Sequence, residues 1–460
     1  MSGAPPGIVA LDALGPTGPF RARRRVTVEE VTGRPAAELS LVPELFVSRA
    51  LAALRRAEEM PVDDRVAALA RAGQAFATAT VAGLPPAAYQ HLVSRVSGLP
   101  LSVVRRAADT IARAAADAHR AVRQARPHSA VDHWRDPATR AGCAVWCRRG
   151  EVFAVLAAGN HPAVHAQWLQ ALALGFRVAV RPSQREPLTA HRLITALREA
   201  GFGPDHVVLL PTDHHTADRI LTHADLATVY GSTETLRAYA GNPLVLPQGP
   251  GRSKILITAD TDWTPWIDTL VASVGHEAGT ACVNATAVLV EGDPTPVAQA
   301  LAEHLAALPV LPPHDERAVL PAQPLATAHA LNKHLLDHAA GATTWLGKDG
   351  VLADLGDGSA VLRPAVHQLD HPGDERAGLE MPFPCVWVTP WTREAGLTPL
   401  RHTLALTALT QDETLIDALV GEPTISGVHI GPHPTHLSTP AMPHDAFLAE
   451  FLMRTKAVIR

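Results

Sequence analysis

The segment GHEAGTACVNATAVLV, residues 275–290, contains Cys282, one of only four cysteines in the 460-residue chain. Cys282 follows a run of small residues and precedes a β-branched run. Free cysteine is among the most buried residue types, so the thiol could simply be a small core side chain. A reactive thiolate at this place could instead attack a carbonyl carbon and hold an acyl group as a thioester. The segment alone leaves both interpretations open.

A second segment of chemical interest is VYGSTETLRAYA, which reads as a strand followed by a helix start at Gly231 and Ser232. Glycine permits close approach of the backbone, and a helix N-terminus with a serine cap suits a phosphate group. An ordinary capped helix would have the same sequence. No G-x-G-x-x-G motif follows the first strand of this region, so an ordinary dinucleotide-binding signature is absent.

The remaining thiols and the histidines give weaker signals. Cys143 and Cys147 lie on one face of an expected strand, and core or interface packing explains them and Cys385. No C-x-x-C pair occurs, which argues against a zinc site. His161 and His276 could lie near Cys282 and either protonate a leaving thiolate or lower the pKa of the cysteine, but chance proximity is the better explanation in a chain with 24 histidines.

Composition limits the class of protein. A net charge of −5 gives no basic surface for nucleic acid or anionic membranes. Four cysteines do not make a disulfide framework, and no apolar run has the length of a membrane span. The N-terminus lacks the features of a signal peptide. We expect a cytoplasmic protein without nucleic-acid or membrane partners.

The elements that must position these residues follow an α/β pattern. Residues 43–125 have helical periodicity, and short β-rich runs then alternate with helical stretches from 143 onwards. This alternation predicts parallel sheets with crossover helices. The last segment, FLMRTKAVIR, is strand-like and is expected to pair with CAVWC, residues 143–147.

Seven segments in a fixed order resemble the aldehyde dehydrogenase superfamily. These are VLAAGNHP, ALALGFRVAVRPSQREPLTAHRL, VYGSTE, LPQGPGRSK, ADTDW, GTACVNA and LEMPFPCVWV. The resemblance covers nearly the whole chain, although its motifs are degraded. It implies an aldehyde dehydrogenase-like α/β fold with two parallel-sheet domains and a small β oligomerisation arm. The implied ranges are 1–126 and 149–254 for the NAD(P)-binding domain, 255–451 for the catalytic domain, and 127–148 and 452–460 for the arm.

The resemblance also implies roles in catalysis. Cys282 would be the nucleophile, and the side-chain amide of Asn160 would help to bind the oxyanion. Gln248 stands where hydrolytic members have the glutamate that activates water, and an amide cannot accept a proton at neutral pH. An acyl group on Cys282 would then survive and could exchange with another thiol. An alternative is that Glu277 or Glu234 supplies the base.

The cofactor residues implied by the resemblance are Arg181, Ser183, Gln184, Gly231, Ser232 and Glu380. Gln184 replaces a glutamate that would repel a 2′-phosphate, and Arg181 adds positive charge. These substitutions predict that NADPH is preferred and that NAD remains possible. Pro382 stands where a phenylalanine is usual, which puts that wall of the cofactor site in doubt.

The departures resemble those of acylating members, in particular the fatty acyl-CoA reductases of bacterial bioluminescence. We therefore expect NAD(P)H-dependent reduction of an acyl thioester, on coenzyme A or a carrier protein, to an aldehyde. A hydrolytic aldehyde dehydrogenase and a non-catalytic scaffold are the alternatives. The family's arm implies a homodimer or homotetramer.

Overall fold

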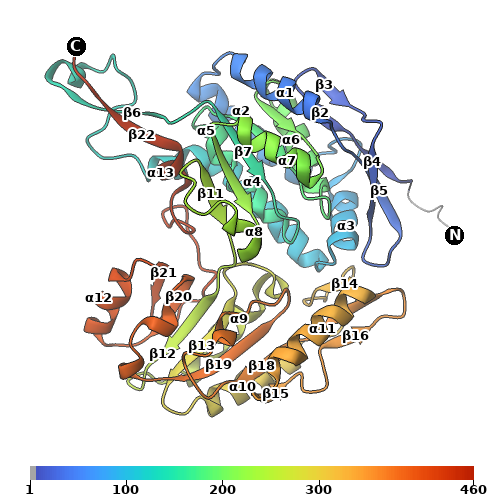
Figure 1. Ribbon diagram of the computed structural model, residues 1–460, viewed down its shortest axis with the longest axis vertical. Helices are drawn as coiled ribbons and strands as arrows, with labels where there is room; N and C mark the ends of the chain where they lie inside the picture. Colours follow the sequence, from blue (N-terminus) through green and yellow to red (C-terminus); the bar gives the residue numbers. More distant parts are fainter. Residues whose placement is uncertain (1–6) are drawn as a thin grey trace.

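The computed structural model describes residues 7–460. Residues 1–6, which belong to the expected NAD(P)-binding range, lie outside the described residues. Figure 1 shows two α/β bodies and an arm formed by two paired strands that projects from the upper body. The α-helices are α1 (Glu44–Arg56), α2 (Val62–Thr78), α3 (Pro86–Ser97), α4 (Leu101–Arg123), α5 (Leu169–Ala173), α6 (Leu188–Glu199), α7 (His214–His223), α8 (Thr233–Arg237), α9 (Ile267–Gly275), α10 (Thr295–Ala306), α11 (Leu325–Ala339), α12 (Glu413–Gly421) and α13 (Leu448–Leu452).

The upper sheet has the strand order β11-β10-β7-β8-β9-β2-β3. Its five parallel strands are β7 (Val152–Leu156), β8 (Arg177–Arg181), β9 (Val207–Leu209), β10 (Leu226–Tyr230) and β11 (Val245–Gln248). Every residue of β7, β8 and β9 is buried, as expected for central strands covered by helices on both faces. The helical region predicted for residues 43–125 is confirmed, and it contains α1 to α4.

The N-terminal strands were not anticipated from the sequence. They are β1 (Val9–Leu11), β2 (Ala13–Gly15), β3 (Gly18–Phe20), β4 (Arg25–Glu29) and β5 (Pro35–Ser40). β2 and β3 extend the upper sheet in antiparallel fashion, and β1, β5 and β4 form a separate three-stranded sheet.

The lower sheet has the strand order β15-β18-β19-β13-β12-β20-β21. Its strands are β12 (Ser253–Ile257), β13 (Ala285–Glu291), β15 (Thr343–Leu346), β18 (Ala365–Gln368), β19 (Cys385–Trp391), β20 (Thr403–Leu409) and β21 (Ile425–Ile430). Only β15 pairs antiparallel. A small side sheet contains β14 (Ala322–Pro324), β16 (Leu352–Asp354) and β17 (Ser359–Leu362).

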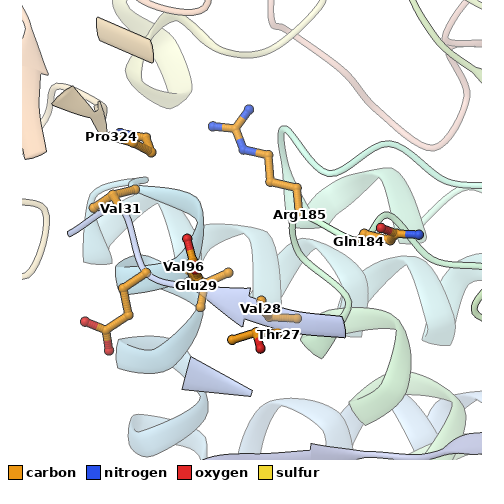
Figure 2. Close-up of a pocket in the computed structure, with 9 residues that line it drawn as sticks. Thr27, Val28, Glu29, Val31, Val96, Gln184, Arg185 and Pro324 are labelled. Carbon is orange, nitrogen blue, oxygen red and sulfur yellow. The ribbon is translucent and has the colours of Figure 1, made fainter. Parts of the chain in front are cut away.

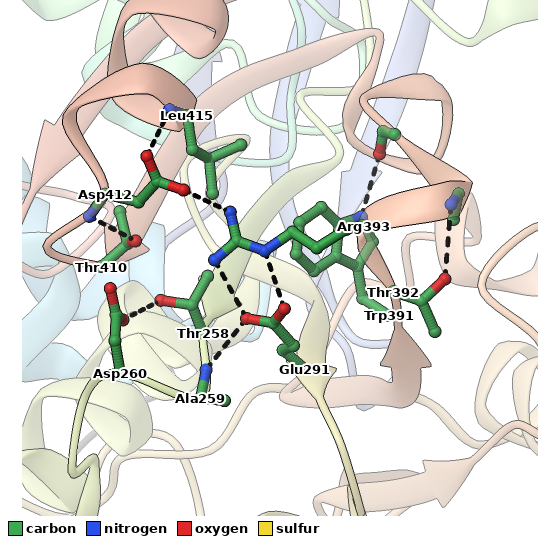
Figure 3. Close-up of polar contacts among 12 residues, drawn as sticks. Thr258, Ala259, Asp260, Glu291, Trp391, Thr392, Arg393, Thr410, Asp412 and Leu415 are labelled. Atoms are coloured by element: carbon green, nitrogen blue, oxygen red, sulfur yellow. Dashed lines mark hydrogen bonds and ion pairs between the residues drawn. The ribbon is translucent and has the colours of Figure 1, made fainter.

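A polar network holds the carboxyl edge of the lower sheet (Figure 3). Arg393 donates to Glu291 at the end of β13 (2.7 Å) and to Asp412, the residue that caps α12 (2.6 Å). Glu291 also accepts a bond from the backbone of Ala259, just beyond β12. This edge is the usual ligand-binding edge of a parallel sheet. In the lower sheet, ion pairs link the residues at this edge to one another. Cys282 lies at the opposite edge of the sheet, just before β13 begins.

The arm is formed as expected by β6 (Cys143–Arg148) and β22 (Met453–Val458). The two strands pair antiparallel from Arg148 opposite Met453 to Cys143 opposite Val458. Within residues 7–460, no helix has both the length and the apolar character that crossing a membrane requires.

Candidate active site

A cleft of about 1310 Å³ separates the two bodies and collects most of the residues singled out in the sequence. The upper sheet contributes residues that follow the carboxyl ends of its strands, and the lower body contributes the loop before β13 and the segment before β19. The predicted residues that line the cleft are Asn160, Gly231, Ser232, Gln248, Cys282 and Glu380. Arg181, Ser183 and Gln184 do not line it.

The Cys282 loop has an unusual backbone. Three consecutive residues, Glu277, Ala278 and Gly279, have positive φ angles of 49°, 60° and 69°. Side chains disfavour this region, so the turn is held by its surroundings. A Cβ at Gly279 would overlap the backbone of Pro384, and one at Gly251 would overlap the carbonyl group of Cys282. The two glycines therefore allow the loop to pack directly on neighbouring backbone.

Cys282 is half-buried, and its closest polar partner is a histidine from a distant part of the chain. The Sγ atom of Cys282 lies 3.3 Å from Nε2 of His444. His444 is in the loop between β21 and α13, and 42 % of its side chain remains accessible through the open cleft. A thiol beside an imidazole is a typical arrangement for an activated nucleophile.

His444 is in turn paired with an acid. Its Nδ1 lies 3.6 Å from Oδ1 of Asp445, and Oδ2 of Asp445 accepts a 2.8 Å hydrogen bond from Nε2 of Gln248. Desolvation alone would lower the pKa of His444. The interactions with Asp445 and with the sulfur of Cys282 outweigh this effect and raise the pKa to about 10. At neutral pH His444 is therefore the imidazolium.

Gln248 is the last residue of β11, and only 8 % of its surface is exposed. Its amide donates to a carboxylate, which fixes the side-chain oxygen and nitrogen in one orientation. The residue predicted to replace the family's base thus contacts the carboxylate beside His444.

Asn160 follows β7 and faces the same loop. Its Nδ2 donates to the backbone oxygen of Thr280, two residues before Cys282, over 3.3 Å. An amide group has two N–H bonds, so this contact leaves the second hydrogen for another acceptor.

Glu277, one of the two acids that could replace the missing base, is already engaged. Its carboxylate pairs with Nε of Arg106 at 3.0 Å and with Nε2 of His161 at 3.1 Å. Burial would raise its pKa, but these two partners outweigh burial and lower the pKa to about 2. The other acid, Glu234, is exposed on α8 and does not line the cleft.

The two histidines considered near Cys282 lie in the cleft wall with Glu277 rather than against the sulfur. His161 bonds Glu277, and the ring of His276 stacks face to face on His436 at 3.7 Å between centroids. Burial and the adjacent His436 lower the pKa of His276 to about 4. His276 is therefore neutral at pH 7.

Glu380 lies just before β19, and its carboxylate accepts a 2.7 Å bond from the backbone nitrogen of Arg252. Burial raises its pKa. Gly231 and Ser232 follow β10, and Ser232 caps α8 by accepting a bond from the backbone of Thr235. These three residues lie on the cleft surface shared by the two bodies.

The residues expected beneath the adenosine ribose are turned toward the protein. Nη2 of Arg181 and Nε2 of Gln184 both donate to the carbonyl oxygen of Thr212, at 3.3 Å and 3.1 Å. Ser183 accepts a bond from the backbone of Arg185. The Nε of Arg181 is buried and has no hydrogen-bond partner among the described residues.

Gln184 and Arg185 also line a smaller cavity of about 200 Å³ against β4, α3 and Pro324. Arg185 extends toward Pro324 whereas Gln184 turns away from it (Figure 2). The guanidinium of Arg185 donates to Gln323 of the lower body at 2.8 Å. Arg185 thus joins the two bodies.

Sequence reasoning missed His444 and Asp445. They lie 162 and 163 positions after Cys282, in a loop without a recognisable motif. A histidine followed by an aspartate was the one local signal, and in a chain with 24 histidines it has no weight by itself.

Each of the two bodies has a largely parallel β-sheet with helices packed on it, and Cys282 lies in the cleft between the bodies. This arrangement defines a two-body α/β architecture. The model of the aldehyde dehydrogenase family matches residues 20–395. The chain therefore belongs to the aldehyde dehydrogenase family.

Individual relatives agree with this assignment over shorter stretches. Human aldehyde dehydrogenase 1A1 is 32 % identical over 144 residues, and the horse protein of that name is 31 % identical over 144 residues. Each match covers 29 % of this chain and 28 % of the relative.

Solved structures match over nearly the full length. An indole-3-acetaldehyde dehydrogenase in complex with NAD⁺ superposes with a TM-score of 0.82 at 19 % identity, covering 97 % of this chain and 96 % of that chain. A 3,6-anhydro-L-galactose dehydrogenase in complex with NAP gives 0.81 at 17 % identity, covering 97 % and 99 %. The aldehyde dehydrogenase fold expected from the sequence is confirmed.

Proposed function

We propose that the protein reduces an acyl thioester, carried on coenzyme A or a carrier protein, to an aldehyde through an acyl group held on Cys282. The observation that carries this proposal is the amide of Gln248. The resemblance places it where hydrolytic members have a glutamate, and its N–H group donates a hydrogen bond to Asp445.

The ion pairs of Glu277 support the same conclusion. Glu277 is held as a carboxylate by Arg106 and His161, and a carboxylate with a pKa of about 2 is a poor acceptor for a proton from water. His444 is protonated beside the free Cys282, because Asp445 and the sulfur of Cys282 raise its pKa to about 10. With an amide at Gln248 and with Glu277 engaged in ion pairs, we expect a thioester on Cys282 to react slowly with water.

The family implies a nicotinamide dinucleotide, and the cleft fits its nicotinamide end. Gly231 lines the cleft after β10, and it packs so closely on Thr235 that a Cβ there would come within 2.9 Å of that side chain. Glu380 and Ser232 would hold the group, and Asn160 would face the carbonyl oxygen of the acyl chain. When bound, the nicotinamide supplies the hydride.

We propose that NADPH is used in preference to NADH and that NADH remains possible. Gln184 supports this preference because a neutral amide does not repel a 2′-phosphate, as a carboxylate at this position would. The ratio of kcat/KM for the two cofactors measures the preference directly. A strong preference for NADH would remove the argument.

The proposed reaction is tested by following three quantities in one assay. An acyl-CoA or acyl-carrier thioester should give loss of NADPH, release of free thiol and formation of aldehyde in equal amounts. The Cys282→Ala variant should give none of them. Production of NADPH from an aldehyde and water, with no thiol present, would instead establish a hydrolytic aldehyde dehydrogenase.

Hydrolytic oxidation is the second candidate, and the names of the relatives favour it, since they are aldehyde dehydrogenases. A non-catalytic scaffold is the third. A stoichiometric mass increase with an acyl thioester, absent in Cys282→Ala, would exclude the scaffold.

We also propose that the protein is a homodimer or homotetramer joined through the arm of β6 and β22. Two large apolar side chains near the arm support this, because Trp134 is 47 % exposed and Ile459 is 76 % exposed.

A further inference from the structure

We propose that His444 is a catalytic residue that donates a proton to the leaving thiol of the substrate, and that Asp445 and Gln248 are positioning residues that orient it. This inference rests on the proposed thioester reduction and concerns its first half, the transfer of the acyl group to Cys282.

The geometry places His444 at the reacting atoms. Its Nε2 lies 3.3 Å from Sγ of Cys282, and both residues line the cleft. When Sγ bonds to the carbonyl carbon, the leaving sulfur is attached to that same carbon. A donor that touches Sγ is therefore within reach of the leaving sulfur.

The orientation of the imidazole is set from behind. Oδ1 of Asp445 lies 3.6 Å from Nδ1, an ion-pair distance, and the opposite ring nitrogen, Nε2, faces Cys282. Asp445 is itself held by the 2.8 Å bond from Gln248, whose position is fixed by β11. The amide of Gln248 thus also holds Asp445 in place by a hydrogen bond. A glutamate at this position would instead place a second carboxylate against that of Asp445.

The step balances as follows. The thiolate of Cys282 attacks the carbonyl carbon, a C–S bond forms, and the carbonyl π electrons move to the oxygen. When the carbonyl reforms, the bond from carbon to the leaving sulfur breaks and its electron pair stays on that sulfur. The leaving sulfur takes the proton of Nε2, which yields a neutral thiol and a neutral imidazole. The imidazole then regains a proton from solvent.

The other histidines in the cleft do not compete for this role. His161 is bonded to Glu277, and His276 is stacked on His436 and neutral at pH 7. Among the described residues, His444 is the histidine whose ring nitrogen contacts the sulfur.

The test compares two thioesters of the same acyl group, without any nicotinamide cofactor. One has an aryl thiol of low pKa, which leaves without a proton, and the other has an alkyl thiol such as N-acetylcysteamine. Acylation is followed by thiol release and by the mass of the protein. His444→Gln is expected to lower acylation by the alkyl thioester about 100-fold or more, within the range of general acid catalysis. Acylation by the aryl thioester should change by less than about threefold.

A matched control is His433→Gln, which changes an exposed histidine of the same loop. It should behave as the unchanged protein with both thioesters. Asp445→Asn should show the same selective loss as His444→Gln to a smaller degree, and a purely structural effect would not depend on the leaving group.

Each outcome decides a different claim. Equal losses with both thioesters in His444→Gln, or no loss with either, would overturn the assignment of His444 and leave the proposed function in place. Failure of the unchanged protein to accept an acyl group from either thioester would instead overturn the proposed function.

Discussion

At the scale of single residues, the proposed function depends on two groups, the amide of Gln248, where the resemblance implies a carboxylate, and the imidazolium of His444 beside Cys282. The amide contributes a donor to Asp445, and Asp445 keeps His444 charged beside Cys282. A cationic neighbour favours the thiolate form of a cysteine. The same set of contacts places a charged donor beside Cys282 and an amide at the end of β11.

Restoring the missing carboxylate tests this exchange. Gln248→Glu should shorten the lifetime of the acyl-enzyme by about tenfold or more, because a carboxylate at this position can accept a proton from water. Its proximity to Asp445 would raise the pKa of one of the two carboxyl groups and so make it a better base. Single-turnover measurements of acid release report the lifetime.

The matched control is Gln248→Met, which has similar volume and no acidic group. It should leave the hydrolysis rate of the acyl-enzyme near that of the unchanged protein. An unchanged lifetime in Gln248→Glu would contradict the importance of this position.

Glu277 leads to a prediction about pH and stability. Its pKa is lowered from its ordinary value near 4.5 to about 2, despite burial, by His161 and Arg106. A lowered pKa stabilises the folded state above about pH 4.5, and this stabilisation is lost as the pH falls toward 2. Glu277→Gln should therefore cost on the order of 2 kcal/mol at pH 7 and much less at pH 3.

Urea unfolding of both proteins at pH 7 and pH 3 measures this difference. The comparison with Glu277→Gln isolates one carboxylate from the other acids of the chain. If the difference between the two proteins were the same at both pH values, the ion pairs of Glu277 would not have the strength assigned to them.

At the scale of elements, the turn before Cys282 depends on Gly279, which belongs to the GTACVNA segment of the sequence. Gly279→Ala should reduce acylation of Cys282 at least 100-fold, because φ is +69° and a Cβ would overlap Pro384. The rate of acylation by an aryl thioester measures this loss. Gly275→Ala is the matched control, since Gly275 has an ordinary φ of −93° and no atom within 4 Å of an added Cβ.

A Gly279→Ala protein that acylates at the normal rate would show that the loop can rearrange without cost. Normal acylation in Gly275→Ala is needed to attribute the loss to the turn itself.

The sequence predicted the elements that are long and strongly periodic. The helices between residues 43 and 125 and the buried strands of both sheets are examples, because their apolar residues recur with the period of the element. The strands β14 and β16 were missed because each contains three residues, too few to show a period. The three-residue strands at the N-terminus were missed for the same reason.

Asn160 and Gln248 were expected from the resemblance to the aldehyde dehydrogenase superfamily, and Gly231 from a strand that leads into a helix. The structure places all three in the same cleft, after β7, at the end of β11 and after β10. His444 and Asp445 could not be found in this way, because folding alone brings them to Cys282 across 162 positions. The contacts of Arg181 and Gln184 with Thr212 likewise depend on the path of the loop after β9.

At the scale of the whole molecule, the arm is the feature that extends beyond the two bodies (Figure 1). Its two strands form a sheet of their own, and Val131 makes a bridge to Val145 on the outer edge of β6. The outer edge of β22 is therefore the edge available to another chain. Removal of residues 453–460 should therefore dissociate the proposed oligomer into monomers. Light scattering coupled to size-exclusion chromatography measures the mass.

The control for this truncation is Arg454→Ala, which removes one exposed side chain and keeps the strand. A truncated protein that retains the mass of the unchanged oligomer would show that another surface joins the subunits.

The central claim is that an acyl group on Cys282 is protected from water and leaves as an aldehyde. The most direct measurement is the fate of an isolated acyl-enzyme, prepared with a radiolabelled acyl thioester and freed of excess substrate. The account predicts that the label stays on the protein in buffer, appears as aldehyde when NADPH is added, and returns to a thioester when free thiol is added. Rapid release of labelled carboxylic acid in buffer alone would contradict it.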